Sequence, residues 1–168
     1  DRIATIGRIP TTGPGETIDR AIDFLRGAGL SRQNCAGFGV ASFGPAVVDR
    51  DAPDWGHIGR TPKPGWSGID IAGAFARAFG APVGFETDVG AAALAEALWG
   101  AARERRTAIY LTVGTGIGGA AVAAGHVLHG RAHAEMGHLL LPRYADDRDF
   151  PGTCPFHGGC VEGLASGT

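Results

Sequence analysis

The sequence predicts an α/β fold, and three features of its patterning support this assignment. Short apolar and β-branched segments alternate along the chain with segments whose apolar residues recur every three or four positions, as expected of strands that alternate with helices. The 29 glycines and 10 prolines stand between these segments and form no low-complexity tract. The 168 residues are enough for one ordinary domain or two small lobes.

The first part of the chain is expected to begin with a strand and a helix. Residues 1–9 are the strand, and apolar residues at helical spacing predict a helix from Glu16 that Gly27 and Gly29 end. A buried strand (35–42) and an irregular loop rich in glycine and proline (53–68) are expected next. They are followed by a short helix (69–80), a strand (81–88) and an alanine-rich helix (89–102).

A polar segment, RERR (103–106), separates these elements from a second part, and we expect a lobe boundary near residue 106. Residues 107–114 predict a strong strand, and residues 120–130 predict a second strand and a turn. The chain starts directly in a strand and stops at VEGLASGT, where a helix is expected to start. Both ends therefore indicate a piece of a larger protein.

Charge and cysteine content argue against several classes of protein. The net charge of −2 gives no reason to expect a nucleic-acid or membrane partner, and no apolar run approaches the ~20 residues that cross a bilayer. The three cysteines are too few, and odd in number, for a secreted disulfide scaffold. Cys35 reads as a small buried apolar residue, and a reducing cytoplasm is the expected compartment.

The segment CPFHGGC (154–160) indicates a metal site. Two cysteines and a histidine at two-residue gaps supply three of the four ligands that zinc prefers. The fourth ligand must come from elsewhere, and His138 is the preferred candidate because residues 139–153 have the length of a loop that leaves a metal and returns to it. The other candidates are His126, His129 and His133. The alternative is a pair of buried cysteines beside a surface histidine.

The segment TVGTGIGG (112–119) contains Gly114, Gly116 and Gly119 in the spacing G-x-G-x-x-G. The residues after it alternate as in a strand, so a hairpin-like turn is favoured over a dinucleotide-binding loop, which needs a helix at this point. Backbone N–H groups of such a turn can bind phosphate oxygens, and Thr115 adds a hydroxyl. The alternative is a glycine turn that binds nothing.

Four further residues are candidates for substrate chemistry. Asp88 ends a predicted strand and precedes a helix, so it can cap the helix or act as a general base, and the helix N-terminus favours its ionised form for either role. Glu135 and His138 are three residues apart and would share one face of a helical turn. Glu162 follows Cys160 closely, so a metal would fix its position. Carboxylates held in this way suit a polyhydroxylated ligand, although isolated acids are commonly solvated surface.

Taken together, these segments resemble the ROK family of sugar kinases, and within it the bacterial fructokinase branch. The matching segments occur in the family's order over nearly the whole chain: GVASFGP (39–45), TPKPGW (61–66), TDVGAAALAE (87–96), YLTVGTGIGG (110–119), HAEMGH (133–138), CPFHGGC (154–160) and VEGLASG (161–167). In much of the family the metal loop contains three cysteines. This chain has His157 in place of one of them, and in this respect its loop resembles that of the fructokinase branch.

The resemblance implies an incomplete two-lobe fold of the actin/hexokinase (ribonuclease H-like) type. Residues 1–106 would be most of the N-terminal lobe without its first strands, and residues 107–168 the start of the C-terminal lobe. The implied activity is ATP- and Mg²⁺-dependent phosphorylation of fructose to fructose 6-phosphate. The alternatives are a kinase for glucose, mannose or N-acetylmannosamine, or a non-catalytic sugar-binding regulator of the same family. The resemblance also implies a homodimer in the full-length parent.

Roles for individual residues follow from the same resemblance. Asp88 would be the catalytic base, the turn formed by Gly114, Thr115 and Gly116 would bind ATP phosphates, and a structural Zn²⁺ would bind the four metal-ligand candidates, His138, Cys154, His157 and Cys160. The hexose would contact Gly65, Trp66, Thr87, Asp88, Glu135, His138 and Glu162.

The sequence departs from the family at two places. Thr87 and Gly90 stand where many members have asparagine. The family's first phosphate loop, with its Gly-Gly-Thr turn, and its adenosine-binding half are absent from the 168 residues. The chain alone is therefore expected not to phosphorylate sugars efficiently.

Overall fold

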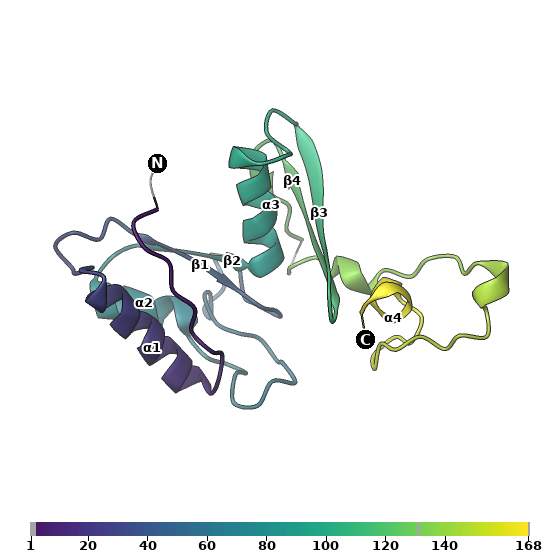
Figure 1. Ribbon diagram of the computed structural model, residues 1–168, viewed down its shortest axis with the longest axis horizontal. Helices are drawn as coiled ribbons and strands as arrows, with labels where there is room; N and C mark the ends of the chain where they lie inside the picture. Colours follow the sequence, from purple (N-terminus) through teal and green to yellow (C-terminus); the bar gives the residue numbers. More distant parts are fainter. Residues whose placement is uncertain (1–2, 131, 168) are drawn as a thin grey trace. The chain divides into compact units, whose positions relative to one another are not determined.

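The computed structural model describes residues 3–130 and 132–167, and it confirms an α/β chain (Figure 1). The chain forms two compact units, which divide between Thr87 and Asp88. No helix among the described residues has the length and apolar character required to cross a membrane.

The first unit is a parallel pair of strands covered by two helices. Its elements are α1 (Pro14–Gly27), β1 (Phe38–Ser42), α2 (Ile71–Phe79) and β2 (Val83–Thr87). β1 and β2 pair in register from Phe38↔Val83 to Ser42↔Thr87. Parallel strands need a long crossover connection, and α2 lies in that connection. Figure 1 shows α1 and α2 side by side on one face of the strand pair.

Aromatic packing joins the helices to the strands of this unit. Phe79, at the end of α2, is 1% exposed, and its ring centroid lies 4.8 Å from that of Phe38 in β1. Ile22 of α1 is buried in the same cluster. A second cluster includes Ile58, Trp66 and other residues of the long loop before α2, so this loop contributes to the core although it lacks regular structure.

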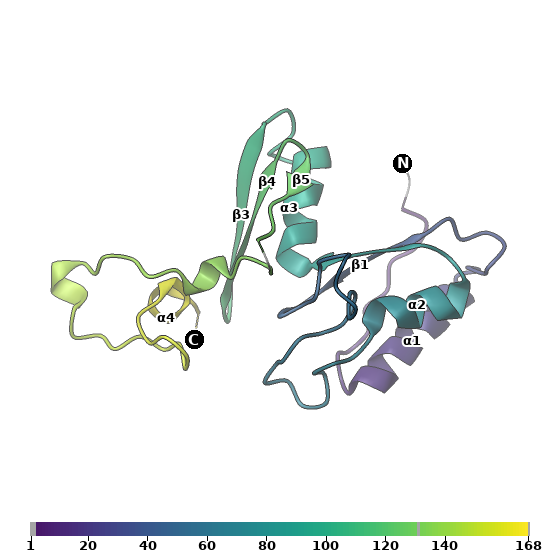
Figure 2. The same ribbon diagram turned by 180° about the vertical axis from the view of Figure 1, so that it is seen from behind.

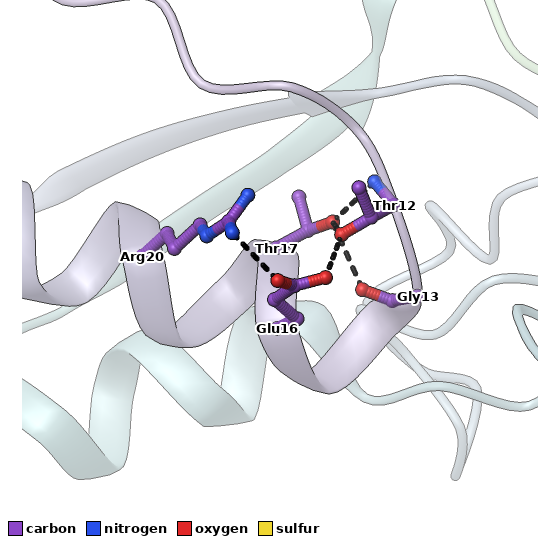
Figure 3. A network of polar contacts seen from close by, with 5 residues as sticks. All are labelled: Thr12, Gly13, Glu16, Thr17 and Arg20. Atoms are coloured by element: carbon purple, nitrogen blue, oxygen red, sulfur yellow. Dashed lines mark hydrogen bonds and ion pairs between the residues drawn. The ribbon is translucent and has the colours of Figure 1, made fainter.

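The start of α1 is held by side chains that precede and follow its N-cap, Gly13, which has no side chain of its own to offer. The Thr12 hydroxyl donates to Glu16 Oε2 (2.6 Å), and the Thr17 hydroxyl donates to the Gly13 carbonyl (2.9 Å; Figure 3). Arg20 Nη2 lies 2.6 Å from Glu16 Oε1, one helical turn further on. The predicted helix is confirmed, and it begins two residues before Glu16 because Pro14 suits the first turn.

The second unit begins with a helix packed on an antiparallel sheet. α3 (Asp88–Trp99) precedes β3 (Thr107–Val113), β4 (Ile117–Ala123) and the short β5 (His126–Val127), and the strand order is β3-β4-β5. Val89 and Ala93 of α3 pack against Ala120 and Val122 of β4. A Cβ at Gly118 would lie 2.8 Å from the Val89 side chain, so the glycine lets the helix approach the sheet.

The rest of this unit, residues 128–130 and 132–167, is a long segment with little regular structure, here called the excursion (Figure 2). It contains η1 (Met136–His138), η2 (Ala145–Asp147) and α4 (Val161–Ala165). Leu140 bridges to Cys160, and Cys154 bridges to Gly158, so the excursion returns to its starting point.

Most predicted elements are confirmed within one to three residues, including the strands over 35–42, 81–88 and 107–114 and the helices over 69–80 and 89–102. The strand predicted over residues 1–9 is wrong for residues 3–9, which form no strand. These residues pair with no other strand of the described chain, and Ile3 and Ile6 are exposed. Residues 1–2 lie outside the described residues. The second strand of the hairpin starts at Ile117, earlier than the predicted residue 120, because Gly118 and Gly119 are part of the ladder.

The division into compact units differs from the lobe boundary expected near residue 106. α3 packs on β3 and β4, so it belongs to the second unit. The assignment of 1–106 and 107–168 to two lobes stays a prediction.

Asp70 is the N-cap of α2, and its replacement is expected to destabilise the first unit. Its carboxylate accepts from Gly73 N–H (2.7 Å) and pairs with Arg77 (2.7 Å). Burial raises the pKa of Asp70, but the bonds from Arg77 and Gly73 outweigh this, and the net pKa lies below 3.8. Asp70→Ala should lower the free energy of unfolding by about 1 kcal/mol, measured by urea unfolding.

The pH dependence of this effect has a definite sign. Because the pKa is lower in the folded state, the stabilisation by Asp70 is present in full above pH 3.8 and is lost as the pH falls through the folded-state pKa. Asp19→Ala, on the exposed face of α1, is the control and should change the stability little. Equal effects of the two substitutions at neutral pH would contradict the capping role.

Candidate functional site

Four side chains of the second unit converge into a candidate metal centre. The ligand atoms of His138, Cys154, His157 and Cys160 all lie within 4.8 Å of one another. His138 Nδ1 is 3.5 Å from Cys160 Sγ and 3.7 Å from Cys154 Sγ, and His157 Nδ1 is 3.9 Å from Cys154 Sγ. The structure therefore brings the expected residues together, with His138 as the fourth member.

These separations suit a tetrahedral ion. Zn–S bonds of about 2.3 Å and Zn–N bonds of about 2.0–2.1 Å place sulfur and nitrogen about 3.6 Å apart across a tetrahedron. Both cysteines are buried, which protects them from solvent, whereas His157 is exposed. Two thiolates and two imidazoles leave no open position for a substrate, so the donor set suits a structural site.

The environment of Cys154 favours the thiolate that a metal requires. Burial raises the pKa of the Cys154 thiol, but hydrogen bonds from the backbone of Phe156 and His157 and from the Cys160 side chain lower it by more. The net pKa therefore lies below the usual 9.0. A lower thiol pKa increases the fraction of thiolate at neutral pH.

Backbone geometry closes the loop around these ligands. Gly158 has φ +58°, a conformation that favours glycine. The Arg143 guanidinium donates through Nη2 to the carbonyls of Asp147 and Phe150, and a Cβ at Gly159 would lie 2.7 Å from its Nη1. Arg143 thus holds the far part of the excursion against the metal loop. No local sequence signal marked this arginine, because its partners are backbone carbonyls.

The turn between β3 and β4 has the predicted hairpin form. Gly114 N–H donates to Gly116 O (2.9 Å), which closes the turn. Among the described residues, the N–H groups of Thr115 and Gly116 have no hydrogen-bond partner. Gly114 and Thr115 are exposed. The turn therefore offers two N–H donors and one hydroxyl to an anion.

Glu162 lies against this turn. Its Oε2 accepts from Ile117 N–H at 3.0 Å, and a Cβ at Gly116 would lie 2.7 Å from the same oxygen. The sequence indicated a sugar contact for Glu162 and gave no signal for this bond, because 45 residues separate the two partners.

Asp88 is the first residue of α3 and is exposed. Its Oδ1 accepts from Val89 N–H at 2.8 Å, and Oδ2 has no partner among the residues that the structure describes. One oxygen thus orients the carboxylate while the other is available to a proton donor. Glu135 is also exposed and precedes η1, and its carbonyl accepts from His138 N–H (2.9 Å), so the predicted helical turn is present.

The remaining substrate candidates belong to the first unit. Trp66 is buried, and its indole N–H donates to Thr12 O at 3.1 Å, so the structure gives this ring a packing role. Gly65 is exposed with φ +77°, and Thr87 ends β2 with 1% exposure. The sugar-binding roles of these three residues stay predictions.

Comparison with known proteins gives a consistent family. The profile of the ROK family matches residues 3–168. A fructokinase of Zymomonas mobilis subsp. mobilis is 50% identical over 168 residues, which are 99% of this chain and 56% of the relative. A putative fructokinase of Bacillus subtilis is 42% identical over 158 residues, which are 94% of this chain and 51% of the relative. The chain thus spans about half the length of the curated relatives it matches.

A solved structure supports the fold class. The ROK hexokinase of Thermus thermophilus aligns with a TM-score of 0.71 and 34% identity, over 94% of this chain and 50% of the other. This likeness confirms the expected α/β fold of the actin/hexokinase-like type.

The metal centre makes a direct prediction. The chain should bind about one zinc ion when it is isolated from zinc-containing medium, and Cys160→Ser should abolish stoichiometric binding because it removes a buried ligand. Cys35→Ser is the matched control, since Cys35 lies in the first unit and outside the cluster. Metal analysis of the purified variants is the measurement. Equal zinc content in the two variants would exclude the assigned ligand set.

Proposed function

The chain belongs to the ROK family, and from this premise we propose that it is a segment of an ATP-dependent sugar kinase that converts fructose to fructose 6-phosphate. The observation that carries the proposal is the match to curated fructokinases over nearly the whole chain. We propose fructose as the substrate, rather than another hexose, because this chain is more similar in sequence to the fructokinases than to the curated glucokinase relatives.

Asp88 is the proposed general base. Its exposed carboxylate has one oxygen held by Val89 N–H and the other unpartnered among the described residues, which supports transfer of a proton from a substrate hydroxyl to Oδ2. The hydroxyl oxygen then attacks the γ-phosphorus of ATP as the bond to the β-phosphate oxygen breaks. ADP leaves with the electron pair of that bond.

The turn at Gly114–Gly116 is the proposed phosphate contact. The N–H groups of Thr115 and Gly116 and the Thr115 hydroxyl can donate to phosphate oxygens, and such donors stabilise the charge of a transferring phosphoryl group. Mg²⁺ bound with ATP would neutralise part of the phosphate charge.

The metal centre is proposed to hold a structural Zn²⁺ and to support the sugar contacts. His138 ends the same 3₁₀ turn that Glu135 precedes, and Cys160 immediately precedes α4, which carries Glu162. We propose that Glu135, His138 and Glu162 bind sugar hydroxyls, together with Asp88 and with the first-unit residues. The first-unit contacts are Gly65, Trp66 and Thr87.

A chimaera tests this function. In it, the 168 residues replace the matching segment of the Zymomonas mobilis fructokinase. The chimaera should phosphorylate fructose with ATP, and Asp88→Asn within it should lower kcat by about 10²–10⁴-fold while the KM for fructose changes little, because the amide cannot accept the proton. A coupled assay of ADP release is the measurement.

Asp146→Asn, an exposed substitution on η2, is the control and should leave kcat unchanged. A folded chimaera that turns over glucose and not fructose would refute the substrate assignment. Full activity of the Asp88→Asn chimaera would refute the assigned base.

A further inference from the structure

The backbone of Ile117, the first residue after the turn, is contacted from two sides by residues next to metal ligands. Glu162 Oε2 accepts from its N–H at 3.0 Å, and Glu162 lies two residues after Cys160. On the carbonyl side, a Cβ at Gly137 would lie 1.8 Å from Ile117 O, and Gly137 directly precedes His138. Only glycine permits this approach. The start of β4, directly after the turn, is therefore in contact with residues that adjoin two of the metal ligands.

A third contact secures the turn from the end of α4. Gly167 N–H donates to Gly114 O at 2.7 Å. The two residues that flank the exposed tip of the turn are thus each bound by the segment that follows Cys160. In the described part of the chain, the position of the tip depends on where this segment lies.

The two short elements that make these contacts depend on the ligand cluster for their own positions. η1 has three residues and α4 has five, and helices of this length are not stable by themselves. His138 ends η1 and Cys160 is the N-cap of α4, and their ligand atoms are 3.5 Å apart. Val161 N–H donates to Leu139 O at 2.9 Å beside the cluster. A bound metal would therefore fix both elements at once.

We propose that Glu162 is a positioning residue that transmits metal occupancy to the β3–β4 turn through the Ile117 N–H. Oε2 holds the turn, while Oε1 has no hydrogen-bond partner among the residues described and remains available to a ligand hydroxyl. Loss of the metal releases α4, breaks the Glu162–Ile117 bond and loosens the turn. The proposal rests on the proposed function only where the turn is taken to bind phosphate.

Residue-resolved amide exchange of the full chain, measured by NMR, tests this link. In the zinc-loaded chain the Ile117 amide should be protected, and Glu162→Ala should raise its exchange rate about tenfold or more, because a bond to a charged acceptor is lost. Glu162→Gln keeps an acceptor oxygen and should stay close to the wild type. Val122, inside the β3–β4 ladder, is the internal reference and should not change.

Removal of zinc with EDTA should produce the same increase at Ile117 in the wild-type chain and a much smaller further increase in Glu162→Ala. Asp146→Ala is the matched control for loss of an acidic side chain in the excursion. An Ile117 amide that is insensitive to Glu162→Ala, or to EDTA, overturns the proposal. If Glu162→Ala fails to fold, the comparison of wild type with and without EDTA, together with Glu162→Gln, still decides.

Addition of ATP with Mg²⁺ separates this inference from the proposed function. Altered exchange or chemical shifts at Thr115 and Gly116 support phosphate binding at the turn. Absence of any change there counts against phosphate binding but leaves the Ile117 result intact. Conversely, shifts at Thr115 and Gly116 with an Ile117 amide unaffected by zinc would refute the positioning role alone.

Discussion

The loop-rich part of the second unit, from η1 to α4, depends on the convergence of two thiols and two imidazoles at one point. Between residues 139 and 160 the excursion has no buried side chain other than Cys154 and Cys160, and several of its large apolar residues, including Leu140, Tyr144 and Phe156, are exposed. Apolar burial therefore contributes little to its structure, and a loop of this length loses considerable conformational entropy when it is ordered. Ligation of one ion would offset that loss, because it joins the start and the end of the excursion.

Several features of the sequence were sufficient to predict the fold. The three- and four-residue steps in α1, the glycine at its end and the strand-like alternation after Gly119 predicted elements that the structure contains. The strand expected over residues 1–9 was wrong for residues 3–9 because pairing decides whether an extended segment becomes a strand, and a local pattern carries no information about pairing. The early start of β4 was missed for a related reason, since Gly118 and Gly119 read as turn residues but pair in the ladder.

The candidate site could be predicted as far as its determinants are local. The two-residue gaps around His157 indicated a metal loop, and the length of the segment between His138 and that loop, residues 139–153, favoured His138 over the other histidines. Contacts between a side chain and distant backbone groups left no such trace. The bond from Ile117 N–H to Glu162 and the bonds from Arg143 to two backbone carbonyls could be identified only in the folded structure. A backbone N–H or C=O is present at nearly every residue, so the sequence does not mark which one is bound.

X-ray absorption at the zinc edge of the purified chain tests most directly whether the four side chains bind a structural zinc ion. A structural zinc site at this cluster should show a four-coordinate ion with two sulfur ligands at about 2.3 Å and two nitrogen ligands at about 2.0–2.1 Å. A zinc shell of oxygen and nitrogen alone, or a chain that retains no zinc although both cysteines are reduced, would contradict it.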